Sequence, residues 1–117
     1  GADVIYDPVG GDVFDQSLRC IAWEGRLLVI GFTSGRIPSA PANLALLKSC
    51  AIVGVFWGAF VERTPHLNLE NFDKLYEWIE AGYIKPRISM KVPLEKTLDA
   101  MKAIANREII GKAIVKI

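Results

Sequence analysis

The residues best placed for chemistry are the glycines and small side chains that follow apolar runs. The clearest run, residues 27–30, ends at Gly31 and continues through Phe32 and Thr33 to Gly35. Glycine allows a positive φ and lets another group approach the backbone closely. In open α/β sheets, ligands bind just beyond the carboxyl ends of the strands. The sequence therefore predicts a ligand site at the loop that begins with Gly31.

Two other apolar runs end in the same way. Residues 2–6 stop at Asp7 and Pro8 and lead into Val9 and Gly10, while residues 51–56 lead into the Trp57 turn. We expect the three endings to share one edge of a sheet, because the carboxyl ends of parallel strands meet there. The alternative is that these glycines are plain turns, which is the commonest use of glycine after a strand.

Other reactive side chains are weaker candidates, and no catalytic residue is assigned. His66 lies beside a proline in a polar turn, where a solvated histidine is expected. Asp7 could orient a ligand hydroxyl or could accept hydrogen bonds from nearby backbone amides. Tyr6, Tyr76 and Tyr83 are proton donors in principle, but the pattern places Tyr6 and Tyr76 on core faces.

The two cysteines predict neither a metal site nor a disulfide. Cys20 and Cys50 have no second cysteine or histidine near them in the sequence. We interpret both as buried thiols in a reducing compartment. No four-ligand zinc set is visible, so no metal is predicted.

Composition limits the possible partners. The 117 residues are 51% hydrophobic and 23% charged, with a net charge of +1, which suits one domain with a real core. A charge near zero gives no electrostatic case for nucleic acid or an anionic membrane. There is no run of about 18 apolar residues and no secretory signal. The first residue is Gly1, which suggests a fragment.

The first part of the chain predicts a strand–helix–strand unit. Asp12 is the expected N-cap of a helix whose buried stripe is Phe14, Leu18, Ile21 and Ala22. Arg26 then starts the strand that ends at Gly31. A continuous apolar run between glycines is typical of a strand that is buried on both faces of a parallel sheet.

The middle of the chain predicts two helices and one strand. A short helix is expected over residues 43–48, with Leu44 and Leu47 facing inward, before the strand over residues 51–56, which Gly54 interrupts. Residues 62–66 are expected to form a surface turn. The apolar spacing over residues 68–81 predicts a helix with Gly82 as its C-terminal cap.

From residue 85 the pattern changes, so residues 84 and 85 mark the best internal boundary. A half-exposed strand alternates over residues 88–92, and a final strand follows Gly111. Between them a helix is expected to face inward with four apolar residues, namely Leu94, Leu98, Met101 and Ile104. The predicted fold class is α/β.

Four motifs occur together in order, and any one of them is weak alone. They are Asp7-Pro-Val-Gly-Gly11, Gly25-Arg-Leu-Leu-Val-Ile-Gly-Phe32, Val53-Gly-Val-Phe-Trp-Gly58, and Pro93-Leu-Glu95 with Gly111-Lys-Ala-Ile-Val115. With them, essentially the whole chain resembles the C-terminal part of a medium-chain dehydrogenase/reductase, in the zinc-independent NADPH:quinone oxidoreductase branch. The resemblance implies that residues 1–84 are the second half of a Rossmann domain, with three parallel strands and flanking helices. Residues 85–117 would return to the substrate domain as strand, helix and strand.

The resemblance also implies a site for a nicotinamide. Backbone groups at strand ends can supply the donor and acceptor that its carboxamide needs. The implied cofactor-binding residues are Val9, Gly10, Ile30, Gly31, Phe32, Thr33, Phe56, Trp57 and Asn106. Asn106 would equally suit a helix C-cap.

As an expectation from the resemblance, the full-length protein moves hydride from NADPH to a quinone or an α,β-unsaturated carbonyl in the cytoplasm. NAD is not excluded as the cofactor. The fragment alone should be inactive, because it has no G-x-G-x-x-G turn for the pyrophosphate. The strand from Ala51 to Phe56 should pair with its twin across a homodimer. The alternatives are a non-catalytic dimerisation or scaffold module and a fragment of a zinc-dependent alcohol dehydrogenase.

Overall fold

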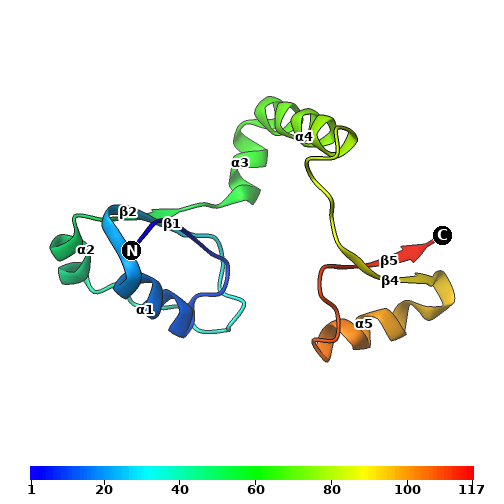
Figure 1. The fold of residues 1–117 in the computed structure, drawn as a ribbon, viewed down its shortest axis with the longest axis horizontal. Coiled ribbons are helices and arrows are strands. Elements are labelled where there is room, and N and C mark those ends of the chain that lie inside the picture. Colours follow the sequence, from blue (N-terminus) through cyan, green and yellow to red (C-terminus); the bar gives the residue numbers. More distant parts are fainter. The chain divides into compact units, whose positions relative to one another are not determined.

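The computed structural model describes all of residues 1–117 and divides them into two compact units, Gly1–Pro65 and His66–Ile117. Both units contain parallel strands joined by helices, so the α/β class is confirmed (Figure 1). The two units divide at Pro65, whereas the expected domain boundary lies between residues 84 and 85. That boundary concerns which domain of a longer protein each segment would join, and it stays a prediction.

The first unit is a three-stranded parallel sheet with strand order β1-β2-β3. Its strands are β1 (Ala2–Asp7), β2 (Ile21–Val29) and β3 (Ala51–Gly54), joined by the helices α1 (Gly11–Cys20) and α2 (Ala42–Lys48). In Figure 1, α1 lies along the strands β1 and β2 that it connects. The predicted strand–helix–strand unit and the short helix before β3 are confirmed.

The core of this unit lies between α1 and the sheet. Phe14 and Leu18 from α1 meet Ile21 and Leu27 from β2, and all four side chains are buried. Ile5, Val29, Leu44 and Ile52 pack around them. Burial of such side chains contributes about 1.5–3 kcal/mol each. Leu27 is therefore central to this core. The predicted burial of the run 27–30 on both faces is wrong, because α1 covers one face only and Leu28, Val29 and Ile30 are half-buried.

The junction between α1 and β2 differs from the prediction. The helix ends at Cys20, and Ile21 already pairs with Ala2 of β1, although the sequence spacing assigns Ile21 and Ala22 to the helix. Val4 pairs with Arg26, so β2 carries a bulge in which Glu24 has a φ of 58°. Ile21 is buried because its side chain fits against Gly25, where a Cβ would lie 2.6 Å from it.

The start of α1 also differs from the prediction. Gly10 is its N-cap residue, with a φ of 67°, and Asp12 lies within the first turn. A carboxylate there still complements the helix dipole.

The chain that follows β3 is more helical than predicted. β3 ends at Gly54, α3 spans Trp57–Arg63, and α4 spans Pro65–Glu80. The expected surface turn at residues 62–66 is therefore wrong, because only Thr64 separates the two helices. The cap at Gly82 is confirmed: its φ is 77°, and the next amide, that of Tyr83, donates to the Trp78 carbonyl at 2.9 Å.

The second unit repeats the strand–helix–strand arrangement. β4 (Ile88–Pro93) and β5 (Lys112–Lys116) are parallel, joined by a 3₁₀ turn (Leu94–Lys96) and α5 (Thr97–Ala105). The predicted inner face of α5 is wrong, because its buried residues are Ala100 and Ala103. The large residues are exposed instead, namely Leu94, Leu98, Met101 and Ile104. Alanines on the buried face let the helix backbone lie close to the two strands.

Several predicted burials do not occur. Leu47, Tyr6 and Tyr76 are all more than half exposed. Tyr6 alternates with the core residue Ile5, so it stands on the sheet face that α1 does not cover. Tyr76 lies on α4, a helix with no buried residue, and Leu47 faces away from the core that its neighbour Leu44 joins.

Both cysteines are free. The predicted burial of both thiols is wrong: Cys20 is exposed at the end of α1, and Cys50, which packs against the core, is only half-buried. None of the helices combines the length and apolarity that a membrane crossing requires.

Gly111 provides a test of the second unit. Its φ is 100°, and a Cβ would lie 2.3 Å from the Arg87 carbonyl oxygen, which accepts the Lys112 amide. We expect Gly111→Ala to destabilise this unit by on the order of 3 kcal/mol, because it adds a backbone clash to left-handed strain. Gly82→Ala is the matched control, since Gly82 has a similar φ but only a distant side-chain neighbour. Chemical denaturation of the two variants should separate them, and equal losses would contradict the assigned clash.

Candidate functional site

The turn after β1 is built around the carboxylate of Asp7. Its Oδ1 accepts the Val9 amide at 2.8 Å and the Gly10 amide at 2.9 Å, and the residue is only 2% exposed. Of the two roles considered for Asp7, the structure shows the local one, in which the side chain stabilises a turn. This turn carries Val9 and Gly10 to the start of α1.

The loop after β2 lies along that turn. Ile30 donates its amide to the Asp7 carbonyl at 2.9 Å, Thr33 to Pro8 at 3.2 Å and Ser34 to Val9 at 3.0 Å. The Thr33 hydroxyl also donates to the Pro8 carbonyl at 3.2 Å. The predicted site residues of the two loops are therefore held together by backbone hydrogen bonds.

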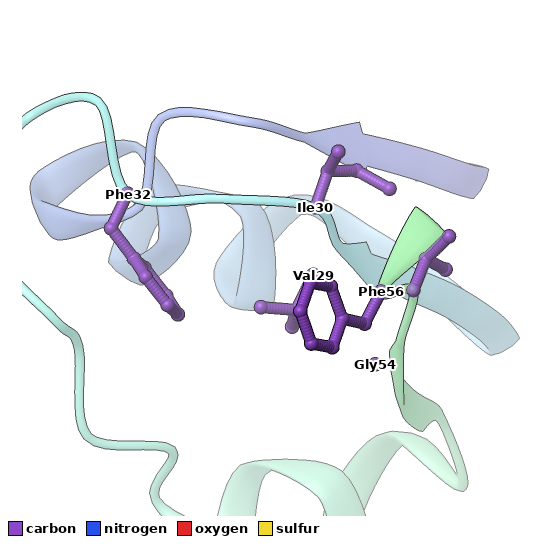
Figure 2. Close-up of a pocket in the computed structure, with 6 residues that line it drawn as sticks. Val29, Ile30, Phe32, Gly54 and Phe56 are labelled. Carbon is purple, nitrogen blue, oxygen red and sulfur yellow. The ribbon is translucent and has the colours of Figure 1, made fainter. Parts of the chain in front are cut away.

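An apolar cleft of about 370 Å³ opens at the carboxyl ends of β2 and β3 (Figure 2). Three predicted site residues line it, namely Ile30, Phe32 and Phe56. The side chains of Phe32 and Phe56 extend toward the same side in Figure 2, whereas that of Ile30 points away from them. The cleft brings together two of the three strand endings that the sequence predicts to meet.

The cleft also includes residues that the prediction omitted, namely Val29, Gly54 and Val55. Val55 continues the pairing of β3 past its end by donating its amide to the Val29 carbonyl at 2.9 Å. The glycine that interrupts an apolar strand was the signal available in the sequence.

Val9 and Gly10 line a second hollow of about 330 Å³, with residues of α1 and the loop after β2. Gly10 lies next to Phe32 of the apolar cleft, because a Cβ on Gly10 would lie 2.8 Å from the Phe32 ring. The third strand ending therefore lies beside the apolar cleft, as the common sheet edge predicts.

The backbone between the two hollows has unused polar groups. The loop hydrogen bonds use the amides of Ile30, Thr33 and Ser34, whereas those of Gly31 and Phe32 donate to no other backbone group. Gly31 and its neighbours can therefore offer a donor and an acceptor to an amide on a ligand.

The last two predicted cofactor-binding residues, Trp57 and Asn106, line neither hollow. Trp57 begins α3, directly after Phe56, whose ring packs over Gly58. Asn106 belongs to the second unit, where it is the C-cap residue of α5 and its side-chain amide donates to Glu108 at 3.1 Å. A cofactor contact by either residue stays a prediction.

Arg36 fixes the far end of the loop to α1. Its Nη2 lies 2.5 Å from Asp15 Oδ2 and 3.0 Å from Asp12 Oδ1, and its carbonyl accepts the Gly11 amide at 3.1 Å. The hydrogen bond with Asp15 raises the pKa of Arg36. No local sequence pattern indicates this contact, because it joins residues more than twenty positions apart.

A family model described as zinc-binding dehydrogenase matches residues 1–115. The chain belongs to this family. It is 45% identical over 98% of its length to a quinone oxidoreductase-like protein 2 homolog of Nematostella vectensis, and 37% identical over its whole length to the mouse quinone oxidoreductase-like protein 2. It spans about a third of the length of each, 32% and 33%.

Solved structures agree with the fold of this zinc-binding dehydrogenase chain. A mycobacterial protein determined in complex with NADPH superposes with a TM-score of 0.82 at 25% identity, covering 98% of this chain and 35% of that one. These likenesses confirm the medium-chain dehydrogenase/reductase superfamily that the sequence resembles, and its Rossmann-type sheet.

The residues of this zinc-binding dehydrogenase chain do not fit a zinc ion. No group of three or more histidine, cysteine, aspartate or glutamate side chains is placed to hold a metal. His66 is exposed, as expected of a surface residue. A nicotinamide fits better, because the apolar cleft and the unused amides of Gly31 and Phe32 suit a flat ring that carries a carboxamide.

Arg36 should control how firmly the loop is held. We expect Arg36→Ala to speed amide hydrogen exchange at Thr33 and Ser34 by about two- to fivefold, since both ion pairs are lost. Arg36→Lys should give a smaller change, because it keeps the charge without the guanidinium fork. Lys74→Ala, which removes the exposed Lys74–Glu77 pair of α4, is the control and should leave the loop unchanged. Identical exchange in all variants would show that the backbone hydrogen bonds alone hold the loop.

Proposed function

We propose that this chain is part of an NADP-dependent oxidoreductase that reduces a quinone or an α,β-unsaturated carbonyl. The observation that carries the proposal is the apolar cleft between Phe32 and Phe56, at the strand ends where ligands bind in such sheets. Named relatives at 37–45% identity are quinone oxidoreductase-like, which supports the same activity.

The bound cofactor would supply the hydride, and this chain would hold and shield the nicotinamide. Phe32 and Phe56 would exclude water from the ring, and the Gly31 and Phe32 amides would orient its carboxamide. Ile30, whose side chain points away from the two rings, would line the site with its backbone. Val9 and Gly10 would lie beside the attached ribose. NADPH in the mycobacterial structure supports NADP as the cofactor, with NAD as the alternative.

The chain would supply the C-terminal third of the complete enzyme. In this proposal residues 1–84 complete the cofactor domain and residues 85–117 join the substrate domain. The chain alone would be inactive, since it contains no G-x-G-x-x-G turn to bind the pyrophosphate. The proposed compartment is the cytoplasm, where free cysteines such as Cys20 and Cys50 persist.

We also propose a homodimer through β3. This strand pairs with β2 on one side only, and Val53 and Val55 are 38% and 39% exposed beside its other edge. A free apolar edge strand must be covered or it aggregates. The twin strand of a second copy would cover it.

A scaffold module would keep this sheet without binding a cofactor, so binding distinguishes the two functions. We expect NADPH to quench the tryptophan fluorescence of the full-length protein, because Trp57 follows the cleft residue Phe56 directly. Trp57→Phe should abolish most of the quenching while NADPH binding, measured by calorimetry, persists. A full-length protein that binds neither NADPH nor NADH would support the scaffold.

The dimer has its own test. We expect Val53→Lys to shift the protein toward monomer in sedimentation experiments at micromolar concentration, since an edge lysine opposes strand pairing. Leu46→Lys is the matched control, because it places the same charge at an exposed leucine of α2. A strictly monomeric parent protein would refute the proposed interface.

A further inference from the structure

Gly54 differs from the other glycines of the chain. Gly1, Gly25 and Gly111 leave no room for a Cβ, which would lie within 2.8 Å of other atoms. Several others adopt a positive φ that disfavours side chains, namely Gly10, Gly11, Gly35 and Gly82. Gly31 and Gly58 have neighbours between 3.1 and 3.4 Å. Only Gly54 combines a φ outside the left-handed region with no atom within 4 Å of a Cβ.

The fold therefore gives no reason for glycine at this position. Glycine in a strand lowers stability, and it often marks a bulge, a tight bend or the close approach of a ligand or another backbone. Gly54 ends β3 and forms no bulge, since its pairing with Val29 is in register, which leaves a close approach. Gly54 pairs with Val29, so a side chain on it would stand on the same face as Val29 and Ile52. Those two side chains pack against the core, whereas the space at Gly54 is open.

That open space belongs to the apolar cleft. Gly54 lines the cleft between Val29 and Phe56, and Figure 2 shows all three at the end of the sheet. A side chain at this position would take volume from a cleft of about 370 Å³ that has no charged residue in its wall. An uncharged, flat ring is the ligand chemistry that such a wall accepts.

We propose that Gly54 is a specificity-determining residue whose missing side chain makes room for the nicotinamide ring. This inference rests on the proposed function, because it assigns the occupant of the same cleft. Gly54 would act by leaving space for the ring and not by donating or accepting a hydrogen bond. The size of residue 54 then decides whether the ring can lie flat against β3.

The test compares Gly54→Ala and Gly54→Val in the full-length protein, with Ala51→Val as the control. Ala51 lies at the other end of β3 and pairs with Arg26, away from the cleft. Two ligands are titrated: NADPH, and 2′-phospho-ADP-ribose, which lacks the nicotinamide. Thermal unfolding and sedimentation are measured for each variant.

We expect Gly54→Val to weaken NADPH binding by at least about tenfold and Gly54→Ala by a smaller factor. Binding of 2′-phospho-ADP-ribose should not change, and thermal stability should stay equal or rise, since the added methyl restrains the unfolded chain. Ala51→Val should bind both ligands like the parent protein.

Five results would overturn the assignment. Unchanged NADPH binding in both Gly54 variants would show that the ring lies elsewhere, with the proposed function intact. Equal weakening of both ligands would show a general disturbance of the site. If the Gly54 variants unfold at a lower temperature than the parent protein, another part of the protein fills the space. If they lose the dimer but bind NADPH normally, a second copy of the chain fills it. If the parent protein itself binds no nicotinamide dinucleotide, the proposed function fails together with this inference.

Discussion

The buried carboxylate of Asp7 is the constraint on which the sheet edge depends. Its two hydrogen bonds to the Val9 and Gly10 amides turn the chain at the end of β1 and hold Gly10 at a positive φ. That glycine leaves room for the Phe32 ring, so the next loop can lie against the turn. A buried acceptor with two donors fixes this geometry more firmly than surface ion pairs do. The cleft therefore has one wall whose position is set before any ligand arrives.

The predictable part of the fold is local in origin. The apolar run at residues 27–30, the alternation over residues 88–92 and the cap at Gly82 each depend on a few neighbouring residues. Hydrophobic periodicity and glycine stops report such features directly. The sharing of one edge by three strand endings also follows, because parallel strands joined by helices must end together.

The unpredicted part depends on partners that are distant in sequence. Ile21 is buried whether it ends a helix or starts a strand, so its apolar character could not decide between them. The bulge at Glu24 follows from the pairing of Ala2 and Val4 with residues of β2. The inner face of α5 cannot be predicted from apolar spacing, because the buried Ala100 and Ala103 are less hydrophobic than the exposed Leu98 and Met101. The link from Arg36 to Asp15 has no local signature at all.

The candidate site consists mainly of backbone groups and apolar surface, and no charged residue lines the cleft. When a bound cofactor supplies the reactive atom, the protein has to provide shape, dryness and a few fixed dipoles. In the proposed site, the backbone amides of Gly31 and Phe32 and the open space at Gly54 would meet these needs. In such a site the glycines are the residues to compare, because the space around each one shows whether the fold itself requires a glycine there.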